Sequence, residues 1–179
     1  MDKMQHTLED RQMARSEVPT DVGGVQAPTD EWTLAALAHA SVLLTLVLGM
    51  AGGIGALVGP IIPLMMVLGY RGKSRFVAQH ALQSLVYQAV GLVVYVVLVA
   101  VMAGWVTIAW TVSGILSAVL VGLLFIPFAL LFTVLTVFLL VCTPIVWLGY
   151  GLYAAYQVYQ GRDFHYWLIG EWLEREARF

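Results

Sequence analysis

Two long apolar stretches dominate the chain, and its charged residues are confined to the segments around them. No Asp, Glu, Lys or Arg occurs from Trp32 to Tyr70 or from Phe76 to Gly161. A charged side chain at the centre of a bilayer costs several kcal/mol, whereas no water-soluble fold requires such a segregation of charge. The pattern therefore predicts an all-α, polytopic membrane bundle.

Breaks in the apolar stretches divide them into candidate helices. At about 1.5 Å per residue, the first segment just spans a hydrocarbon core of about 30 Å. Gly52 and Gly53 separate it from a second segment, in which Pro60 and Pro63 should either kink the helix or make it begin near Pro60. The four expected transmembrane helices cover residues 32–50, 54–70, 77–103 and 132–157.

Residues 104–131 exceed what four crossings need. They are expected to form an interfacial or re-entrant insert, a helix extension on the outer side, or an extra helix that would make five crossings. Of the nine Lys and Arg residues, three lie in the amino-terminal tail, three within residues 71–75 and three after Gly161. Four crossings place all of them on one side, as the positive-inside rule favours. The sequence thus predicts a multi-pass protein of the cell (inner) membrane with both termini in the cytoplasm.

The two ends of the chain differ from its middle. Residues 1–31 are polar and acidic without sustained apolar periodicity, which is typical of a disordered tail. Within residues 162–179 the apolar side chains recur at helical spacing, which predicts an amphipathic helix lying in the membrane interface. The side chains expected to mark the membrane interface are Trp32, Arg71, Lys73, Arg75, Trp167 and Trp172.

Composition narrows the possible function. The chain is 60% hydrophobic and 11% charged, with a net charge of −2, and it offers no basic patch for a nucleic acid. Its single cysteine, Cys142, allows no intrachain disulfide. The apolar stretches hold no Asp, Glu, Lys or Arg, and no phosphate-binding loop, nucleophile elbow or carboxylate pair is present. We therefore expect neither an enzyme nor a proton-coupled transporter, and no cofactor.

Histidines are the residues that most suggest chemistry. With four crossings, His39, His80 and His165 fall near one membrane boundary, so they are candidate ligands for a metal ion or a haem. No local metal motif accompanies them, and the preferred interpretation is a structural polar cluster that bonds across helices. Gly55 and Gly59, spaced by four, allow a neighbouring backbone to approach closely. The expected helix-packing and polar set is His39, Ser41, Gly55, Gly59, Gln79, His80, Gln83 and Ser84.

Three short motifs together resemble a widespread bacterial family of small four-helix membrane proteins of unknown function. They are LAHAS from Leu37, RFVAQHALQS from Arg75 and QGRDFHY from Gln160. That family is similar to the Tic-twenty-like component of the chloroplast inner-envelope import machinery. The resemblance covers Glu31 to about Trp172. It implies four helices and a part in protein transport or membrane-complex assembly, and it implies no catalytic residue.

The sequence leaves three hypotheses for function. The lack of intramembrane charge and the small-residue faces favour a non-enzymatic accessory or assembly component of a membrane complex. Its expected partners are the lipid bilayer and other membrane proteins or further copies of the chain, without nucleic acid. The polar start of the third helix, with Gln79 and Gln83, favours a channel or translocation-related pore instead. A metal- or haem-binding membrane protein, using His39 and His80, is the third hypothesis.

Overall fold

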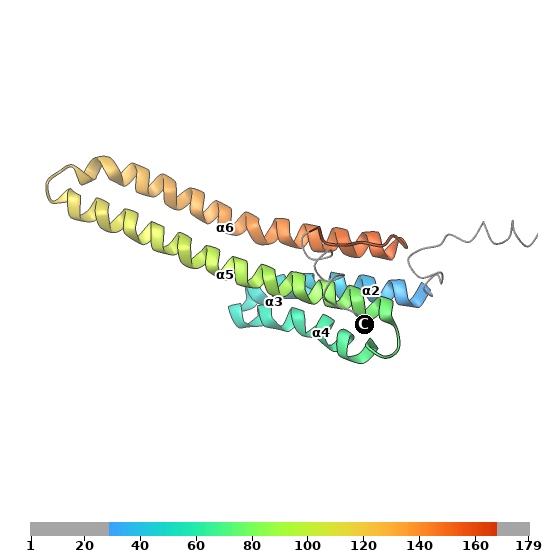
Figure 1. Cartoon of the computed structure of the whole chain (residues 1–179). Coiled ribbons are helices and arrows are strands. Elements are labelled where there is room, and N and C mark those ends of the chain that lie inside the picture. Colours follow the sequence, from blue (N-terminus) through green and yellow to red (C-terminus); the bar gives the residue numbers. More distant parts are fainter. Residues whose placement is uncertain (1–28, 168–179) are drawn as a thin grey trace, which may run out of the picture.

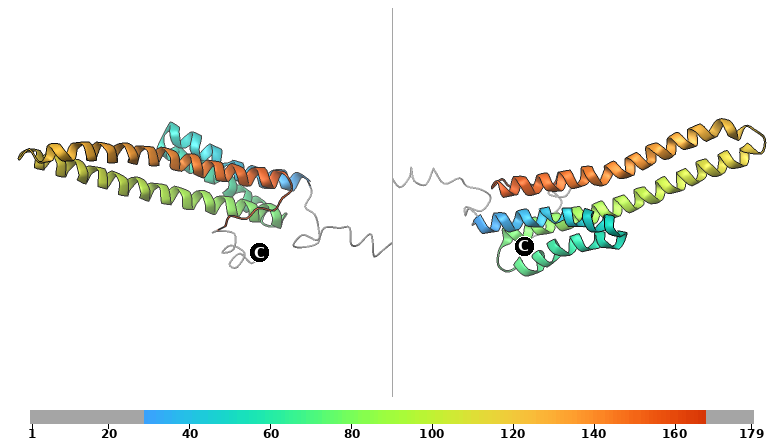
Figure 2. Two further views of the ribbon diagram at one scale, coloured as in Figure 1. Left: turned by 90° about the horizontal axis from the view of Figure 1, so that it is seen from above. Right: turned by 180° about the vertical axis from the view of Figure 1, so that it is seen from behind.

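The computed structural model describes residues 29–167, and all regular secondary structure within this range is helical. Two long antiparallel helices form a hairpin, and shorter helices pack along only the half of it that is nearer the termini (Figures 1 and 2). This confirms the all-helical prediction. The elements are α2 (Thr29–Ala40), α3 (Val42–Ala51), η1 (Gly53–Leu57), α4 (Val58–Tyr70), α5 (Arg75–Ser117) and α6 (Gly122–Tyr159).

Helices α2 and α3 form one almost continuous rod that is interrupted at Ser41. The Ser41 hydroxyl donates to the carbonyl of Ala38 at 2.7 Å, a local bond of the kind that bends helices. The rod contains a 22-residue apolar segment that is long enough to cross a membrane. It begins before the expected start at residue 32, because Asp30 and Glu31 occupy the first turn, where carboxylates interact favourably with the helix dipole.

The second predicted helix, over residues 54–70, is shorter than expected. Its first residues belong to η1, and α4 begins only at Val58. The 13 residues of α4 extend about 20 Å, which is less than the thickness of a bilayer core. Pro63 lies inside α4 and is buried. Among the described residues, three helical segments are long and apolar enough to span a membrane, and α4 falls short of that length.

Helices α5 and α6 are both longer than predicted. Helix α5 continues past residue 103 to Ser117, and α6 begins at Gly122 rather than at residue 132. Residues 104–131 are therefore helix extensions at the far end of one hairpin, which was one of the expected alternatives, and they form neither a separate insert nor an extra helix. The 43 and 38 residues of these helices extend about 64 and 57 Å, roughly twice the thickness of a bilayer core. No charge or helix-breaking turn marks the point at which we expected α5 to end.

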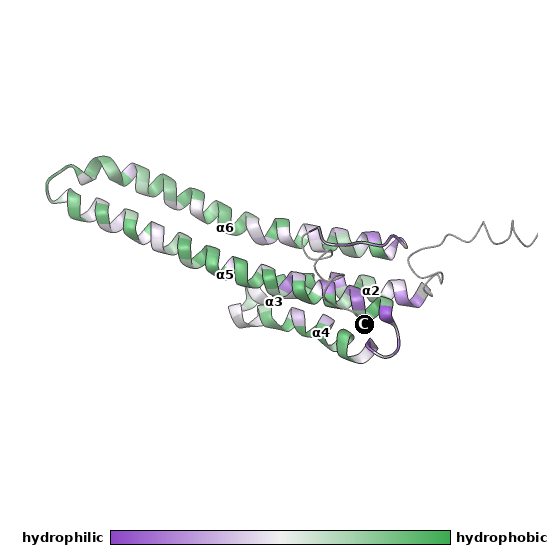
Figure 3. Cartoon of the chain, in the orientation of Figure 1, coloured by the Kyte–Doolittle hydropathy of each residue, from purple (hydrophilic) through white to green (hydrophobic). Residues whose placement is uncertain are grey.

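The packed core lies at the end of the bundle near the termini. Small side chains allow the helices to approach one another there, and Ala35, Ala38, Ala81 and Ala154 are completely buried. Polar residues gather at this same end, whereas the far part of the hairpin is apolar (Figure 3). Most buried side chains among the described residues therefore lie beside the polar groups.

The two terminal predictions lie largely outside the described residues. The predicted disordered tail covers residues 1–31, of which residues 29–31 begin α2. The predicted interfacial helix covers residues 162–179, of which residues 162–167 are described and are not helical.

Candidate functional site

A line of side-chain hydrogen bonds joins three separate segments of the chain. The Tyr166 hydroxyl lies 3.0 Å from His39 Nδ1, and His39 Nε2 lies 3.2 Å from His80 Nδ1. His80 Nε2 then lies 3.3 Å from Asp163 Oδ1. His39 comes from α2, His80 from the second turn of α5, and the other two residues follow α6. We call these four residues the relay; it runs from a buried tyrosine to a half-exposed carboxylate.

The hydrogen bonds of the relay all point in one direction. Burial raises the pKa of the Tyr166 hydroxyl well above its usual 10.0, so this group keeps its proton and donates to His39 Nδ1. His39 therefore carries its proton on Nε2 and donates to His80, which in turn donates from Nε2 to Asp163. The hydrogen bond from His80 holds the pKa of Asp163 below its usual 3.8, and nearby His165 acts in the same direction. The ionised carboxylate thus orients both imidazoles.

The two candidate metal ligands His39 and His80 contact each other directly in the structure. Each ring already uses both nitrogens within the relay. A haem iron bound by two imidazoles requires nitrogens about 4 Å apart on opposite faces of the macrocycle. His165 approaches the relay through Asp163, at 3.9 Å from Nδ1 to Oδ1. Among residues 29–167, no three His, Cys, Asp or Glu side chains are arranged to hold a metal ion.

A second polar network lies further along α5 and joins that helix to α2 and α3. Gln88 Nε2 donates to the hydroxyls of Ser41 and Ser84 at 2.8 and 3.1 Å. Gln88 Oε1 accepts from the Thr45 hydroxyl at 2.7 Å. The hydroxyls of Ser41 and Ser84 both donate to the backbone carbonyl of Ala38. These bonds hold α5 against the interruption between α2 and α3.

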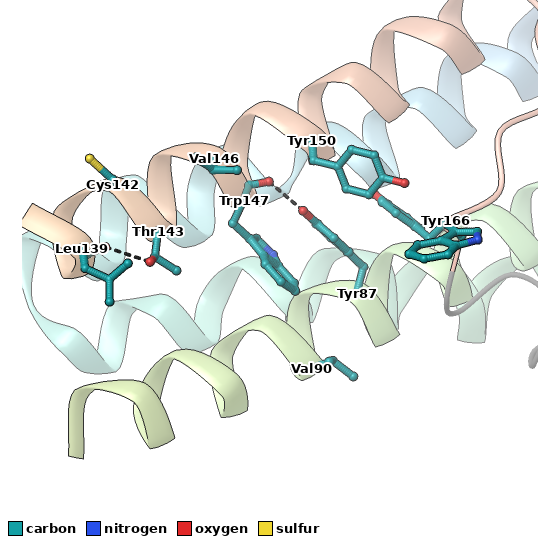
Figure 4. A pocket seen from close by; sticks show the side chains of 10 residues that line it. Tyr87, Val90, Leu139, Cys142, Thr143, Val146, Trp147, Tyr150 and Tyr166 are labelled. Carbon is teal, nitrogen blue, oxygen red and sulfur yellow. Dashed lines mark hydrogen bonds between the residues drawn. The ribbon is translucent and has the colours of Figure 1, made fainter. Parts of the chain in front are cut away.

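Stacked aromatic rings connect the relay to a pocket between α5 and α6 (Figure 4). The Tyr87 ring lies between those of Tyr166 and Trp147, with centroid distances of 4.2 and 4.4 Å. The Tyr87 hydroxyl donates to the backbone carbonyl of Trp147 at 2.7 Å. The pocket has a volume of about 560 Å³ and is lined by aromatic and aliphatic residues together with Cys142 and Thr143. It offers aromatic and apolar contact, and its lining among the described residues contains no His, Asp, Glu, Lys or Arg.

The structure brings together part of the predicted polar set. His39 and His80 belong to the relay, and Ser41 and Ser84 belong to the second network. Gln83 is also buried, and its Oε1 has no hydrogen-bond partner among the described residues. The last polar member, Gln79, is half-buried.

The two predicted packing glycines lie where helices meet closely. A Cβ atom added to Gly59 would collide with Thr45, and one added to Gly55 would collide with Leu48. Both neighbours lie on α3, so these glycines allow η1 and α4 to fold back against that helix.

The predicted interface residues surround the same end of the bundle. Trp32 packs edge-on against Phe76, with ring centroids 4.5 Å apart. Trp167 is 81% exposed, as expected for an aromatic anchor in the headgroup region. Trp172 lies outside the described residues. The three cations, which are exposed in or next to the turn between α4 and α5, are Arg71, Lys73 and Arg75.

Sequence reasoning did not place Asp163, Tyr166 and Gln88 in the polar cluster. Tyr166 is 127 positions from its partner His39, and no local spacing connects the two. The available signal was the run from Asp163 to Tyr166 directly after a long apolar helix. Antiparallel helices with four crossings return this run to the membrane boundary that holds His39 and His80.

Acidification should weaken the attachment of the segment after α6. Because the folded pKa of Asp163 lies below 3.8, its charge contributes stability above that pH, and this contribution is lost as the pH falls through the folded value. Asp163→Asn keeps an acceptor for His80 but removes the charge. We expect it to be slightly less stable than the wild type at about pH 7, with a small gap because the carboxylate is half exposed, and we expect the gap to close as the pH falls through the folded pKa of Asp163. Thermal unfolding in detergent micelles measures this gap, and a gap that does not change with pH would contradict the assignment.

Comparison with known proteins identifies a family. A family model described as the magnetosome magnetite crystal formation protein family, MamF/MmsF, matches residues 30–173. No curated protein and no solved structure matches the chain. The resemblance to a Tic-twenty-like family is therefore wrong. Its motifs are short runs of small, polar and aromatic residues at helix ends, which many membrane bundles require for packing and interfacial anchoring.

Proposed function

The chain belongs to the MamF/MmsF family of magnetosome magnetite crystal formation proteins, and from this premise we propose that it is a non-enzymatic accessory protein of the magnetosome membrane that supports crystal formation. Its long apolar helices make it a membrane protein. In the proposed arrangement the bundle is an anchor, and its polar end is the part that meets other components.

The observation that supports this proposal is the position of charge. Within residues 29–167, every charged side chain lies at the end of the bundle near the termini, where the polar residues gather in Figure 3. The described helices hold no buried Asp, Glu, Lys or Arg, and the two buried histidines, His39 and His80, have both ring nitrogens engaged within the relay. The seven charged residues are Asp30, Glu31, Arg71, Lys73, Arg75, Arg162 and Asp163.

The relay supports a positioning role rather than a chemical one. Its inner end is the Tyr166 ring, which stacks on Tyr87, so the line of hydrogen bonds stops among aromatic rings. Its outer end attaches the segment after α6 to α2 and α5 through His80 and Asp163. We infer that the relay fixes where the charged carboxy-terminal region leaves the bundle, and so where a partner meets it.

The proposed topology has four membrane-embedded helical segments, which are the α2–α3 rod, α4, α5 and α6, and both termini in the cytoplasm. This arrangement places the turn between α4 and α5, with its three cations, on the same side as both termini. In this topology the short helix α4 lies in the membrane beside α3, and the two helices pack closely at Gly59 and Thr45. The topology can be tested with a protease added from the cytoplasmic side. We expect cleavage at both Lys73 and Arg178, because the topology places both on that side.

The structure offers less support for a pore. The polar side chains at the start of α5 include Ser84 and Gln88, which bond to neighbouring helices instead of facing an open channel. The pocket between α5 and α6 is lined mainly by aromatic and aliphatic side chains. These contacts favour helix packing and therefore the accessory role.

Deleting the gene from a magnetosome-forming cell should change the size or shape distribution of its magnetite crystals, measured by electron microscopy. Reintroducing the wild-type gene should restore the distribution. His39→Leu should restore it poorly, because the relay no longer positions the carboxy-terminal region, whereas the matched His165→Leu change at the surface should restore it well. Equal protein levels in the membrane fraction are the control. Normal crystals in the deletion strain would overturn the proposal.

A further inference from the structure

The α5–α6 hairpin continues far beyond the helices that cover its base. Buried residues of α5 cluster between Val77 and Gly91, and the next one is Ser113. We call residues 93–146 the distal hairpin. Its large apolar side chains are exposed on the outer sides of both helices, away from the seam where the two pack together. Those at least 60% exposed include Val93, Ile115, Leu124, Phe128 and Phe138.

The tip of the distal hairpin is also apolar. Residues 118–121 connect the two helices, and within them Val119 and Leu120 are 66% and 74% exposed. Turns that face water are ordinarily built from Gly, Asn, Asp, Ser or Pro. Here Leu120 adopts a φ of 66°, in the left-handed region that bulky residues seldom occupy. An apolar residue at such a position has no advantage in water.

Most amides of the tip are hydrogen-bonded within the chain, which lowers the cost of placing them in hydrocarbon. The amides of Ala118, Val119 and Leu120 donate to the carbonyls three residues earlier, at 3.0 to 3.3 Å. Five hydroxyls of the distal hairpin donate to the carbonyl four residues earlier, whereas Thr136 Oγ1 is buried without a partner among the described residues. The five residues whose hydroxyls donate in this way are Thr107, Ser113, Ser117, Thr133 and Thr143.

We propose that the distal hairpin, including its tip, lies inside the hydrocarbon of the same bilayer that holds the base of the bundle. Because α5 is about 64 Å long and a bilayer core is about 30 Å thick, a straight hairpin must incline by about 60° from the membrane normal, or else bend within the membrane. The hairpin therefore does not project into the aqueous space on the far side. This inference concerns the lipid contact of the chain and does not depend on its role in crystal formation.

Lipid is favoured over a second copy of the chain as the occupant of this surface. The exposed side chains cover all sides of the hairpin, whereas a protein partner would cover one face and leave the others open. Hydrocarbon also requires no charged or polar group from the protein, and the span from Phe76 to Gly161 contains no Asp, Glu, Lys or Arg.

The test measures the depth of the tip in a membrane. In a Cys142→Ala background, a bimane label on Leu120→Cys is compared with one on Lys73→Cys, in the full-length protein reconstituted in phosphatidylcholine vesicles. We expect lipids with brominated acyl chains to quench the tip label, and we expect iodide in the buffer to quench it about ten-fold less than the Lys73 label, because the ion is excluded from the hydrocarbon core. Val119→Cys repeats the measurement at a neighbouring tip position, in case Leu120→Cys does not fold.

Two results would overturn the proposal. Equal iodide quenching at the tip and at residue 73 would place the tip in water. Weak quenching by brominated lipids that grows stronger as protein is diluted into lipid would mean that another copy of the chain covers the tip. Neither result bears on the crystal phenotype, so the failure of this proposal is distinguishable from the failure of the proposed function.

Discussion

His39→Leu should lower the free energy of unfolding by about 2–4 kcal/mol, because it leaves two buried polar groups without partners. The Tyr166 hydroxyl loses its acceptor at His39 Nδ1, and His80 Nδ1 loses its donor. Leucine fills most of the volume of the imidazole, so the change reports the lost hydrogen bonds more than a cavity. Denaturant unfolding of the purified protein in detergent micelles, followed by tryptophan fluorescence, measures the effect.

A matched substitution and a double variant make this test specific. His165→Leu changes the same residue type at a site that is 41% exposed, and it should cost no more than about 0.5 kcal/mol. Adding Tyr166→Phe to His39→Leu removes the unpaired hydroxyl and should recover about 1 kcal/mol. Equal losses for the two histidine variants, or strictly additive losses for His39 and Tyr166, would show that the relay is not an energetic unit.

Gly59→Ala should lower the free energy of unfolding by about 1–3 kcal/mol, whereas Gly69→Ala on the same helix should raise it by up to about 1 kcal/mol. A Cβ on Gly59 would meet the Thr45 side chain and would lie 2.7 Å from the Thr45 backbone nitrogen, so α3 itself has to move. That movement also disturbs the bond from Thr45 to Gln88. Gly69 has open space at this position, and alanine there only removes flexibility from the unfolded chain.

The same unfolding measurement applies to both glycine variants. Because the substitution and the helix are identical, differences in helix propensity cancel in the comparison. Two variants that shift stability in the same direction by the same amount would contradict the close contact between α3 and α4.

Helix length shows where prediction from sequence stopped. The start of α5 was close to the expected one, because the charged turn before it is visible in the chain and Ser74 caps the helix by accepting from the Val77 amide. The end of α5 differed from the expected one, because the sequence analysis allowed this helix only a single membrane crossing. Hydropathy shows that a residue avoids water, but it does not limit the length of a helix. Helices α5 and α6 therefore extend as far as the turn at residues 118–121.

The relay and the second polar network were also predictable only in part. His39, Ser41, His80 and Ser84 were predictable as members of a polar cluster, because polar side chains within an apolar helix must find partners. Which partners they find was not predictable. His39 bonds Tyr166, and Ser41 bonds Gln88, and neither pairing has a signature in local spacing.

By itself, the sequence determined that this is an all-helical membrane protein with its charges gathered outside the apolar stretches. The energetic penalty on charge in hydrocarbon acts on each residue where it stands in the chain, so it can be evaluated residue by residue. Only the tertiary structure decided that Tyr166, His39, His80 and Asp163 form one relay and that the long hairpin extends beyond its covering helices. A hydrogen bond requires atoms about 3 Å apart, and that proximity arises only when helices distant in sequence pack together.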